Sequence, residues 1–276
     1  MFNITRSLSH HARHELSDAD LMQKAPSIFA GQAMTGVSDR YTFLPTAQII
    51  TRMREAGWAP VQADEQRVRL ENRQGFQKHL IRFQRRDLIA VKDEYAAEIC
   101  LLNSHDRSSA YQLHAGLFRF ICANGLMIAD GQFQRVSIRH SGFSPEEVIA
   151  ASERAFAQLP YITARVDTFR NRTLTAPEAD TFAQRALALR YATPEKAPVA
   201  AGKLLQARRM DDQANSLWNV FNRVQENLLQ GGLKDYSRRK QDGSRFPRTR
   251  SVTGLDESVR LNKELWQLAE EFTITA

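Results

Sequence analysis

Cysteine is scarce in this sequence, which has two, Cys100 and Cys122, in 276 residues. Two cysteines build no disulfide framework, and neither lies in a CxxC or Cys/His spacing that would hold zinc. No window approaches the ~18 apolar residues that span a bilayer, and the N-terminus lacks the apolar stretch of a secretory signal. We therefore expect a cytoplasmic protein with no membrane partner, no metal and no cofactor.

The short motifs that carry well-defined chemistry are missing too. The chain contains no P-loop, no GxGxxG, no HExxH and no GxSxG. It therefore offers no recognisable site for nucleotide phosphates, for a metalloprotease or for a serine nucleophile. Carboxylates gather between residues 87 and 106, but without the spacing of a metal-dependent nuclease.

What the sequence does hold is an excess of positive charge. Lys and Arg number 38 against 31 Asp and Glu, which gives a formal net charge of +7. The hydrophobic fraction of 42% and the charged fraction of 25% are those of an ordinary globular protein, and the length fits one or two domains. A basic balance favours a polyanionic partner.

The charge is concentrated in two segments. Residues 67–86, the first basic segment, hold seven basic residues against one acidic residue, a net +6. Residues 234–250, the second basic segment, hold seven against two, a net +5, so the rest of the chain carries −4. Clustering of this kind is typical of a surface with a polyanionic target, and the alternative is a pair of solvated loops.

Apolar spacing predicts a helix and then strands in the first half of the chain. A helix is expected over 45–56, with Ile49, Ile50 and Met53 on one face. Residues 58–71 and 76–86 are rich in strand formers around a turn at 71–75, which predicts a β-hairpin with a basic exposed face. A third strand is expected at 96–103, a helix at 113–122 from apolar residues at spacing four, and strand character over 126–139.

The second half has the periodicity of helices, expected over 144–172, 177–191 and 216–229 and in a last helix that ends near 272. The predicted fold class is α+β: a helix, a basic β-hairpin and a small antiparallel sheet in an α-β-β-β-α core, followed by a helical C-terminal half. The predicted regions are an N-terminal arm at 1–40, the core at 41–143, and the helical region at 144–276 with a basic loop at 233–254.

The central turn has the sequence NSHDRSSAY at 103–111. His105 and Asp106 are the best candidates for acid–base chemistry. As neighbours on an extended chain they would point to opposite faces, which disfavours a dyad between them. The alternative is a structural turn, in which Asn103, Asp106 and the serines bond local backbone groups.

The second basic segment combines cations with the rings of Tyr236 and Phe246. Arginine on phosphate together with an aromatic ring on a base is the usual combination for single-stranded nucleic acid. The glycines of this segment predict a loop that is mobile until it binds. Besides the two rings, the predicted nucleic-acid contacts are Arg67, Arg69, Arg82, Arg85, Arg86, Arg238, Arg239, Lys240, Arg245, Arg248 and Arg250.

Several stretches resemble one protein family: YTFLPT at 41–46, LNSHDRSSAY at 102–111, GLFRFICANGL at 116–126 and LWNVFNRVQEN at 217–227. Over nearly the whole chain they are similar to the uncharacterised YfjQ/YafZ-type proteins of prophages, plasmids and integrative elements. The central family motif comprises Asn103, Ser104, His105, Asp106, Ser108, Ser109, Tyr111, Gly116, Arg119, Asn124 and Gly125. Arg107 departs from the family, which usually has glycine there, so a positive φ at this position would strain the arginine.

The resemblance implies a protein of a mobile genetic element. The expected order of helix, basic hairpin, third strand and helix is also similar to the core of single-strand annealing proteins such as RecT, Erf and the Red annealase, an analogy of fold alone. Our first hypothesis is therefore a non-enzymatic protein that binds single-stranded DNA in annealing or recombination, with a homo-oligomer as a further expectation.

Two other hypotheses stay open at this point. One is a metal-dependent nuclease, or another nucleic-acid hydrolase, that uses His105 and Asp106. The other is an anti-defence or regulatory protein that binds a host protein. The sequence separates neither DNA from RNA nor a functional central turn from a structural one.

Overall fold

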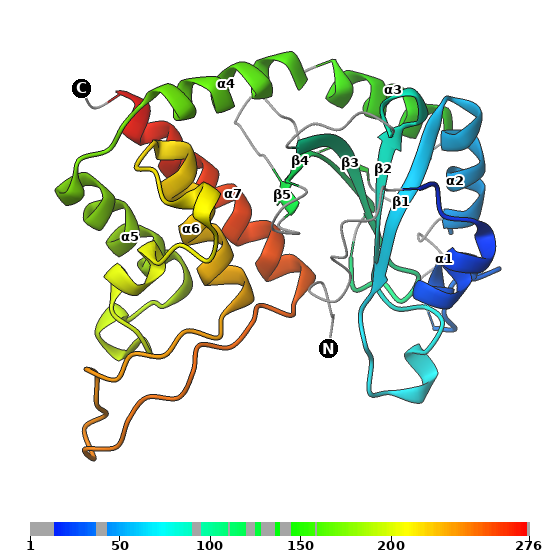
Figure 1. Cartoon of the computed structure of the whole chain (residues 1–276). Coiled ribbons are helices and arrows are strands. Elements are labelled where there is room, and N and C mark those ends of the chain that lie inside the picture. The colour runs from blue at the N-terminus through cyan, green and yellow to red at the C-terminus, as the bar shows by residue number, and fades with distance from the viewer. Residues whose placement is uncertain are drawn as a thin grey trace. The chain divides into compact units, whose positions relative to one another are not determined.

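The computed structural model describes residues 14–36, 43–89, 95–109, 111–119, 125–127, 136–138, 145–157 and 159–274 (Figure 1). The chain divides into two compact units, Met1–Leu159 and Pro160–Ala276, and each buries its own apolar residues. Within the described ranges, no helix combines the length and the apolar composition needed to cross a membrane.

An antiparallel sheet forms the centre of the first unit. Its strands among the described residues are β1 (Trp58–Glu65), β2 (His79–Arg85), β3 (Tyr95–Asn103), β4 (Tyr111–Arg119), β5 (Gly125–Met127) and β6 (Val136–Ile138). They are ordered β1-β2-β3-β4-β5, and β6 also pairs with β4. The register sets His79 opposite Asn103, so the start of β2 lies beside the end of β3, where the central turn begins.

Helices pack against this sheet. They are α1 (Asp18–Lys24), α2 (Thr46–Glu55) and α3 (Pro145–Phe156). Ser17 caps α1 in a reciprocal pair with Asp20. The predicted apolar stripe of α2 is buried, and α2 runs alongside β1 in Figure 1 and contacts both β1 and α3.

The second unit is helical, with α4 (Leu159–Asn171), α5 (Ala176–Arg190), α6 (Leu217–Gln230) and α7 (Leu255–Ile274). All residues of α6 from Leu217 to Leu228 except Asn219 are buried, so this helix forms the centre of the unit. Phe221 of α6 and Trp266 of α7 meet edge to face, with 6.2 Å between their ring centroids. Short 3₁₀ turns at Pro194–Lys196, Ala201–Leu205 and Met210–Asp212 connect α5 to α6.

The α+β class and the helical C-terminal half are confirmed, but the helix predicted at 113–122 is wrong, because its described part is strand β4. Residues four apart share a face of a strand as well as a face of a helix, so the spacing did not separate the two. The helix predicted at 144–172 is two helices, and Pro160 in the first turn of α4 explains why the first does not continue. The hairpin strands are also shorter than predicted, so residues 66–78 form a loop.

Candidate nucleic-acid interface and central turn

Local hydrogen bonds fix the central turn, residues 103–109. Asp106 Oδ1 accepts a hydrogen bond from the Ser108 amide at 2.9 Å, and Ser104 Oγ accepts one from the Ser109 amide at 2.9 Å. The other oxygen of Asp106 pairs with Arg73 Nε at 3.2 Å. These are the side-chain to backbone contacts that the structural alternative predicts.

Arg107 has a φ of 65° and is the one non-glycine residue of the described chain with a positive φ. The position therefore requires the left-handed conformation in which a glycine is unstrained. The Arg107 guanidinium donates to the Gly36 carbonyl at 3.0 Å, and the Met34 amide donates to the His105 carbonyl at 3.1 Å. Both bonds tie the turn to the segment that precedes α2.

A buried polar cluster lies behind the turn. Thr46 Oγ1 is 3.2 Å from His105 Nε2 and 2.9 Å from His79 Nε2, and Asn103 Nδ2 donates to it at 2.9 Å. His79 Nδ1 is 3.0 Å from Ser27 Oγ. All five side chains are fully buried. The cluster therefore joins the first residue of α2, the start of β2 and the end of β3.

The partners of Thr46 determine where the protons lie. A hydroxyl donates one hydrogen bond and accepts two, while the Asn103 amide nitrogen can only donate. His79 Nδ1 is 3.2 Å from the Gln77 carbonyl, so this nitrogen carries the proton. Thr46 then donates to His79 Nε2 and accepts from His105 Nε2, so the His79 imidazole is neutral. Burial, with a smaller effect from the neighbouring His105, lowers the pKa of His79 to about 3.

The two catalytic candidates face different partners. His105 is buried against Thr46, with the Phe43 ring centroid 4.9 Å from its own, whereas Asp106 bonds Ser108 and Arg73. In the part of the chain that the structure describes, no three His, Cys, Asp or Glu side chains are grouped to hold a metal ion. Of the other motif residues, Tyr111 is buried, Gly116 and Arg119 lie in β4, Gly125 begins β5, and Asn124 lies outside the described residues.

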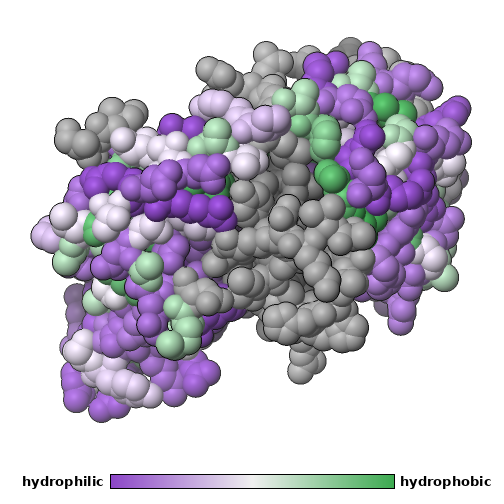
Figure 2. Space-filling view, turned by 45° about the horizontal axis from the view of Figure 1, so that its top comes forward, coloured by the Kyte–Doolittle hydropathy of each residue, from purple (hydrophilic) through white to green (hydrophobic). Residues whose placement is uncertain are grey.

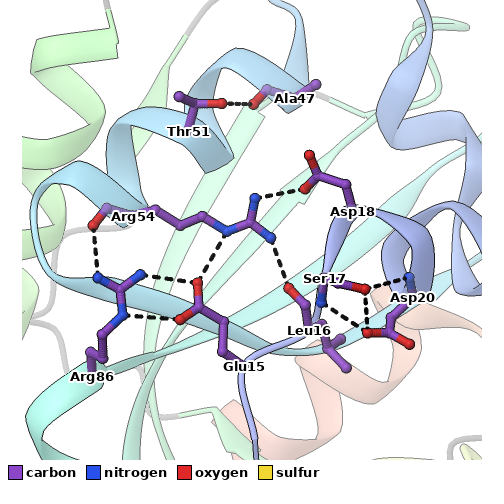
Figure 3. A network of polar contacts seen from close by, with 9 residues as sticks. All are labelled: Glu15, Leu16, Ser17, Asp18, Asp20, Ala47, Thr51, Arg54 and Arg86. Carbon is purple, nitrogen blue, oxygen red and sulfur yellow. Dashed lines mark hydrogen bonds and ion pairs between the residues drawn. The ribbon is translucent and has the colours of Figure 1, made fainter.

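Most cations of the first basic segment are used inside the first unit. Arg86 binds both oxygens of Glu15, at 2.9 and 3.0 Å, and Arg54 Nε lies 3.2 Å from the same carboxylate (Figure 3). Arg85 pairs with Glu153 at 3.3 Å, and its guanidinium carbon lies 5.7 Å from the ring centroid of Trp58. Arg85 and Arg86 were predicted to contact phosphates, but in the fold their guanidinium groups bind carboxylates of the same unit.

Arg82 is deeply buried. It forms an ion pair with Glu98 and donates to Gln62 Oε1 at 2.9 Å, while Gln84 donates to the second oxygen of Glu98 at 3.2 Å. Burial lowers the pKa of Arg82 to about 10. Because 5% of its surface is exposed, Arg82 does not lie on the basic outer face that the hairpin was predicted to have. Lys78, the residue before this strand, is buried as well.

Two exposed arginines of the first segment, Arg67 and Arg69, have no carboxylate partner among the described residues. Arg67 and Arg69 lie in the loop between β1 and β2, which projects below the sheet in Figure 1. Neither makes an ion pair or a hydrogen bond with any residue that the structure describes. Of the predicted basic face of the hairpin, these two side chains are the ones that are both exposed and unpaired within the described chain.

The second basic segment belongs to an antiparallel excursion between α6 and α7, residues 233–250, which we call the basic arm (orange in Figure 1). At its base the Thr249 amide donates to the Leu233 carbonyl at 3.0 Å. Near its tip the backbones of Arg239 and Arg245 pair in an isolated antiparallel β-bridge, and the Lys240 amide donates to the Ser244 carbonyl at 2.7 Å. The arm therefore follows a defined hairpin path, where the glycines predict a mobile loop.

Two side chains anchor the part of the arm near its base to its own unit. The Arg238 guanidinium donates to the Val199 carbonyl at 2.9 Å and also to the carbonyls of Pro194 and Glu195. Asp235 is buried and accepts from the Ala200 amide at 2.9 Å. Hydrogen bonds, chiefly from Ser237, hold the pKa of Asp235 below its ordinary value. Arg238, predicted to contact phosphate, is therefore an anchor of the arm.

The remaining cations of the arm are exposed and form no ion pair with a carboxylate among the described residues, although Lys240 lies close enough to Asp242 to contribute to the lowering of its pKa. They are Lys234, Arg239, Lys240, Arg245, Arg248 and Arg250. The carboxylate at the tip, Asp242, accepts from the Ser244 amide at 2.8 Å. The surface over the arm, at the lower left of Figure 2, is predominantly hydrophilic.

The two aromatic candidates differ in exposure. Tyr236 is 61% exposed, with Lys234 Nζ at 5.8 Å and the Arg245 guanidinium carbon at 5.2 Å from its ring centroid. Phe246 is half-buried, and the anchored Arg238 lies over it at 5.6 Å. Of the two predicted stacking rings, Tyr236 is therefore the one that is open to solvent.

Sequence reasoning missed the anchors of the arm. Asp235 counted only as a negative charge, although Asp-x-Ser is a recognised turn signal and its Oδ1 accepts from the Ser237 amide at 3.1 Å. Arg190 of α5 donates to the carbonyls of Leu228 and Arg250, which clamps the base of the arm. No local pattern predicts that contact, because Arg190 and Arg250 are 60 residues apart.

Residues 33–266 match the family described as Domain of unknown function (DUF932), a range that includes the central turn and the basic arm. The chain is 35% identical over 255 residues to the UPF0380 protein YafZ of Escherichia coli strain K12, which covers 92% of this chain and 90% of YafZ. It is 34% identical to the UPF0380 protein YfjQ of the same strain, with the same coverage. No solved structure matches the chain. The chain therefore belongs to the DUF932 family, as its central motif predicts.

Proposed function

We propose that the protein binds single-stranded nucleic acid, DNA by preference, through the basic arm, as an annealing or recombination protein of a mobile genetic element. The observation that carries the proposal is the set of six exposed cations in the arm that form no ion pair with a carboxylate within the described chain. Cations of this kind bind phosphates with release of counterions, which supplies most of the affinity for a nucleic-acid backbone.

The path of the arm supports the same proposal. Arg238 and Asp235 hold the part of the arm near its base, and the antiparallel β-bridge between Arg239 and Arg245 holds the part near its tip. A binding element that is already ordered loses less conformational entropy on association than a free loop does. The cations of the arm are thus presented to a strand at a lower entropic cost.

The first unit adds less to the proposal than its charge suggests. Arg67 and Arg69 are its contribution, from the loop between β1 and β2. The annealing part of the proposal draws on the mobile-element context of the resembling proteins and on the order of α2, β1, β2 and β3. Because strand β4 stands where the annealing proteins were expected to have a helix, the fold analogy extends no further than β3.

Binding of a labelled oligonucleotide of about 20 nucleotides at about 50 and about 200 mM salt tests the proposal. The variant Arg239→Ala/Lys240→Ala/Arg245→Ala is expected to lose affinity and about 2 units of the salt slope, because each phosphate contact on a single strand contributes about 0.7. The control Arg52→Ala/Arg154→Ala/Arg185→Ala removes as many exposed cations outside the arm and should leave the slope unchanged. Absence of wild-type binding at the lower salt would end the proposal.

Further measurements address the other parts of the hypothesis. Faster pairing of two complementary strands in the presence of the protein supports annealing, and light scattering with and without a strand tests a homo-oligomer. The nuclease and host-protein alternatives stay predictions. Hydrolysis of DNA or RNA with Mg²⁺ or Mn²⁺ would support the first, and a pull-down partner that survives nuclease treatment would support the second.

A further inference from the structure

We infer that Tyr236 stacks on an unpaired base, and that this ring gives the basic arm its preference for single strands over duplexes. The inference rests on the proposed function and assigns its specificity to one side chain. Charge alone binds single strands and duplexes alike, because both present phosphates. A preference for single strands needs a group that reads the face of a base, which a duplex keeps inside its stack.

The exposure of Tyr236 is the first observation. Burial of a large aromatic surface normally stabilises a fold. The Tyr236 ring is nevertheless 61% exposed, and the arm is held by Arg238 and Asp235 instead. The cations Lys234 and Arg245 lie beside the ring. Phe246, the second ring of the arm, is half-buried beneath an arginine that is itself held by three carbonyls.

The position of the two cations is the second observation. Lys234 Nζ and the Arg245 guanidinium carbon lie 5.8 and 5.2 Å from the centre of the Tyr236 ring. In a single strand each base is flanked by a phosphate on either side along the backbone. A base stacked on Tyr236 therefore brings its phosphates toward cations that are already next to the ring. Stacking of bases on aromatic side chains tolerates any sequence, because every base has a π-face.

A bracing role for the ring makes a different prediction. If Tyr236 only held Lys234 and Arg245 in place, its removal would disturb the charges of the arm. Every polyanion would then be bound less tightly, whether or not it carries bases. A stacking role affects only ligands with accessible bases, so two ligands of equal charge separate the two roles.

The experiment compares oligothymidylate of about 20 nucleotides with an abasic strand of the same length and charge. Wild-type protein is expected to bind the thymidylate strand about five- to tenfold more tightly, from stacking on one base. Tyr236→Leu should bind both strands equally, at the level of the wild type on the abasic strand and with an unchanged salt slope. Tyr236→Phe, which keeps the ring, should retain the difference.

Phe246→Leu is the matched control, and it should keep the wild-type difference between the two strands. The inference is overturned if Tyr236→Leu still prefers thymidylate, or if it loses affinity for both strands alike. Equal binding of both strands by the wild type would also overturn it, while leaving the charge-based proposed function intact. Failure of the wild type to bind either strand contradicts the proposed function itself.

Discussion

The two basic segments carry nearly the same net charge in the sequence and are used differently in the fold. In the first segment one lysine is buried and four arginines meet a carboxylate, in the pairs Arg73–Asp106, Arg82–Glu98, Arg85–Glu153 and Arg86–Glu15. In the basic arm, none of the seven cations forms an ion pair with a carboxylate within the described chain. The first segment stabilises its own unit, whereas most cations of the arm remain exposed to solvent.

The net charge counted in a sequence segment therefore says little about the charge that the folded surface presents. Glu15 lies 71 residues from Arg86 in the sequence, and Glu153 lies 68 residues from Arg85. A window of twenty residues does not contain these carboxylates, and the fold brings them in.

The largest effect is expected from the buried ion pair. Arg82→Ala leaves Glu98 charged and without its guanidinium in the sheet, so the free energy of unfolding should fall by about 3–5 kcal/mol. Urea unfolding followed by circular dichroism measures this. Arg67→Ala, in the same segment but exposed, should stay within about 0.5 kcal/mol of the wild type. Equal urea midpoints for the two variants would show that burial does not separate these arginines.

A second effect concerns the base of the arm. Gly231 has a φ of 62°, and a Cβ added there would lie 2.5 Å from the carbonyl carbon and oxygen of Arg250. Gly231→Ala should therefore destabilise the second unit by about 2–3 kcal/mol and open the arm to proteases. Gly243→Ala has similar backbone strain, with a φ of 79°, but no atom within 4 Å of the new Cβ. Thermal unfolding should show a clearly smaller loss for Gly243→Ala, and an equal loss would refute the role of the close approach.

The first basic segment also contains His79, which should make the first unit sensitive to acid. Its pKa is about 3 in the folded protein and 6.5 in the unfolded chain, so the unfolded state takes up the proton first as the pH falls. Stability is fully present above pH 6.5 and should fall by about 2 kcal/mol by pH 5. His79→Gln should flatten this dependence, whereas replacement of the exposed His14 should not. Parallel pH profiles for wild type and His79→Gln would contradict the assignment.

The sequence predicted the elements whose signal is local. The apolar stripe of α2, the third strand, and α6 with Gly231 behind it follow from spacing and from glycine. The hydrogen bond from the Ser108 amide to Asp106 in the central turn follows from the chemistry of the aspartate side chain, whereas its ion pair with Arg73 was not predicted. The cluster around Thr46 does not, because it joins residues 33 and 59 positions apart in the sequence. The same holds for the cations, because only long-range contacts distinguish those that are paired with a carboxylate from those that are not.

The smallest effect is expected from two double variants of the first basic segment. Each variant removes two positive charges, so the pair tests directly whether internal pairing matters. Arg67→Ala/Arg69→Ala removes two exposed arginines that form no ion pair in the described chain, and Arg85→Ala/Arg86→Ala removes two that are paired with Glu153 and Glu15. On a long single strand the first variant should lose about 1.4 units of the salt slope with unchanged stability. The second should keep the slope, because its guanidinium groups already neutralise carboxylates, and it should unfold more easily. Equal losses of slope would mean that total charge governs binding and that internal pairing does not protect it.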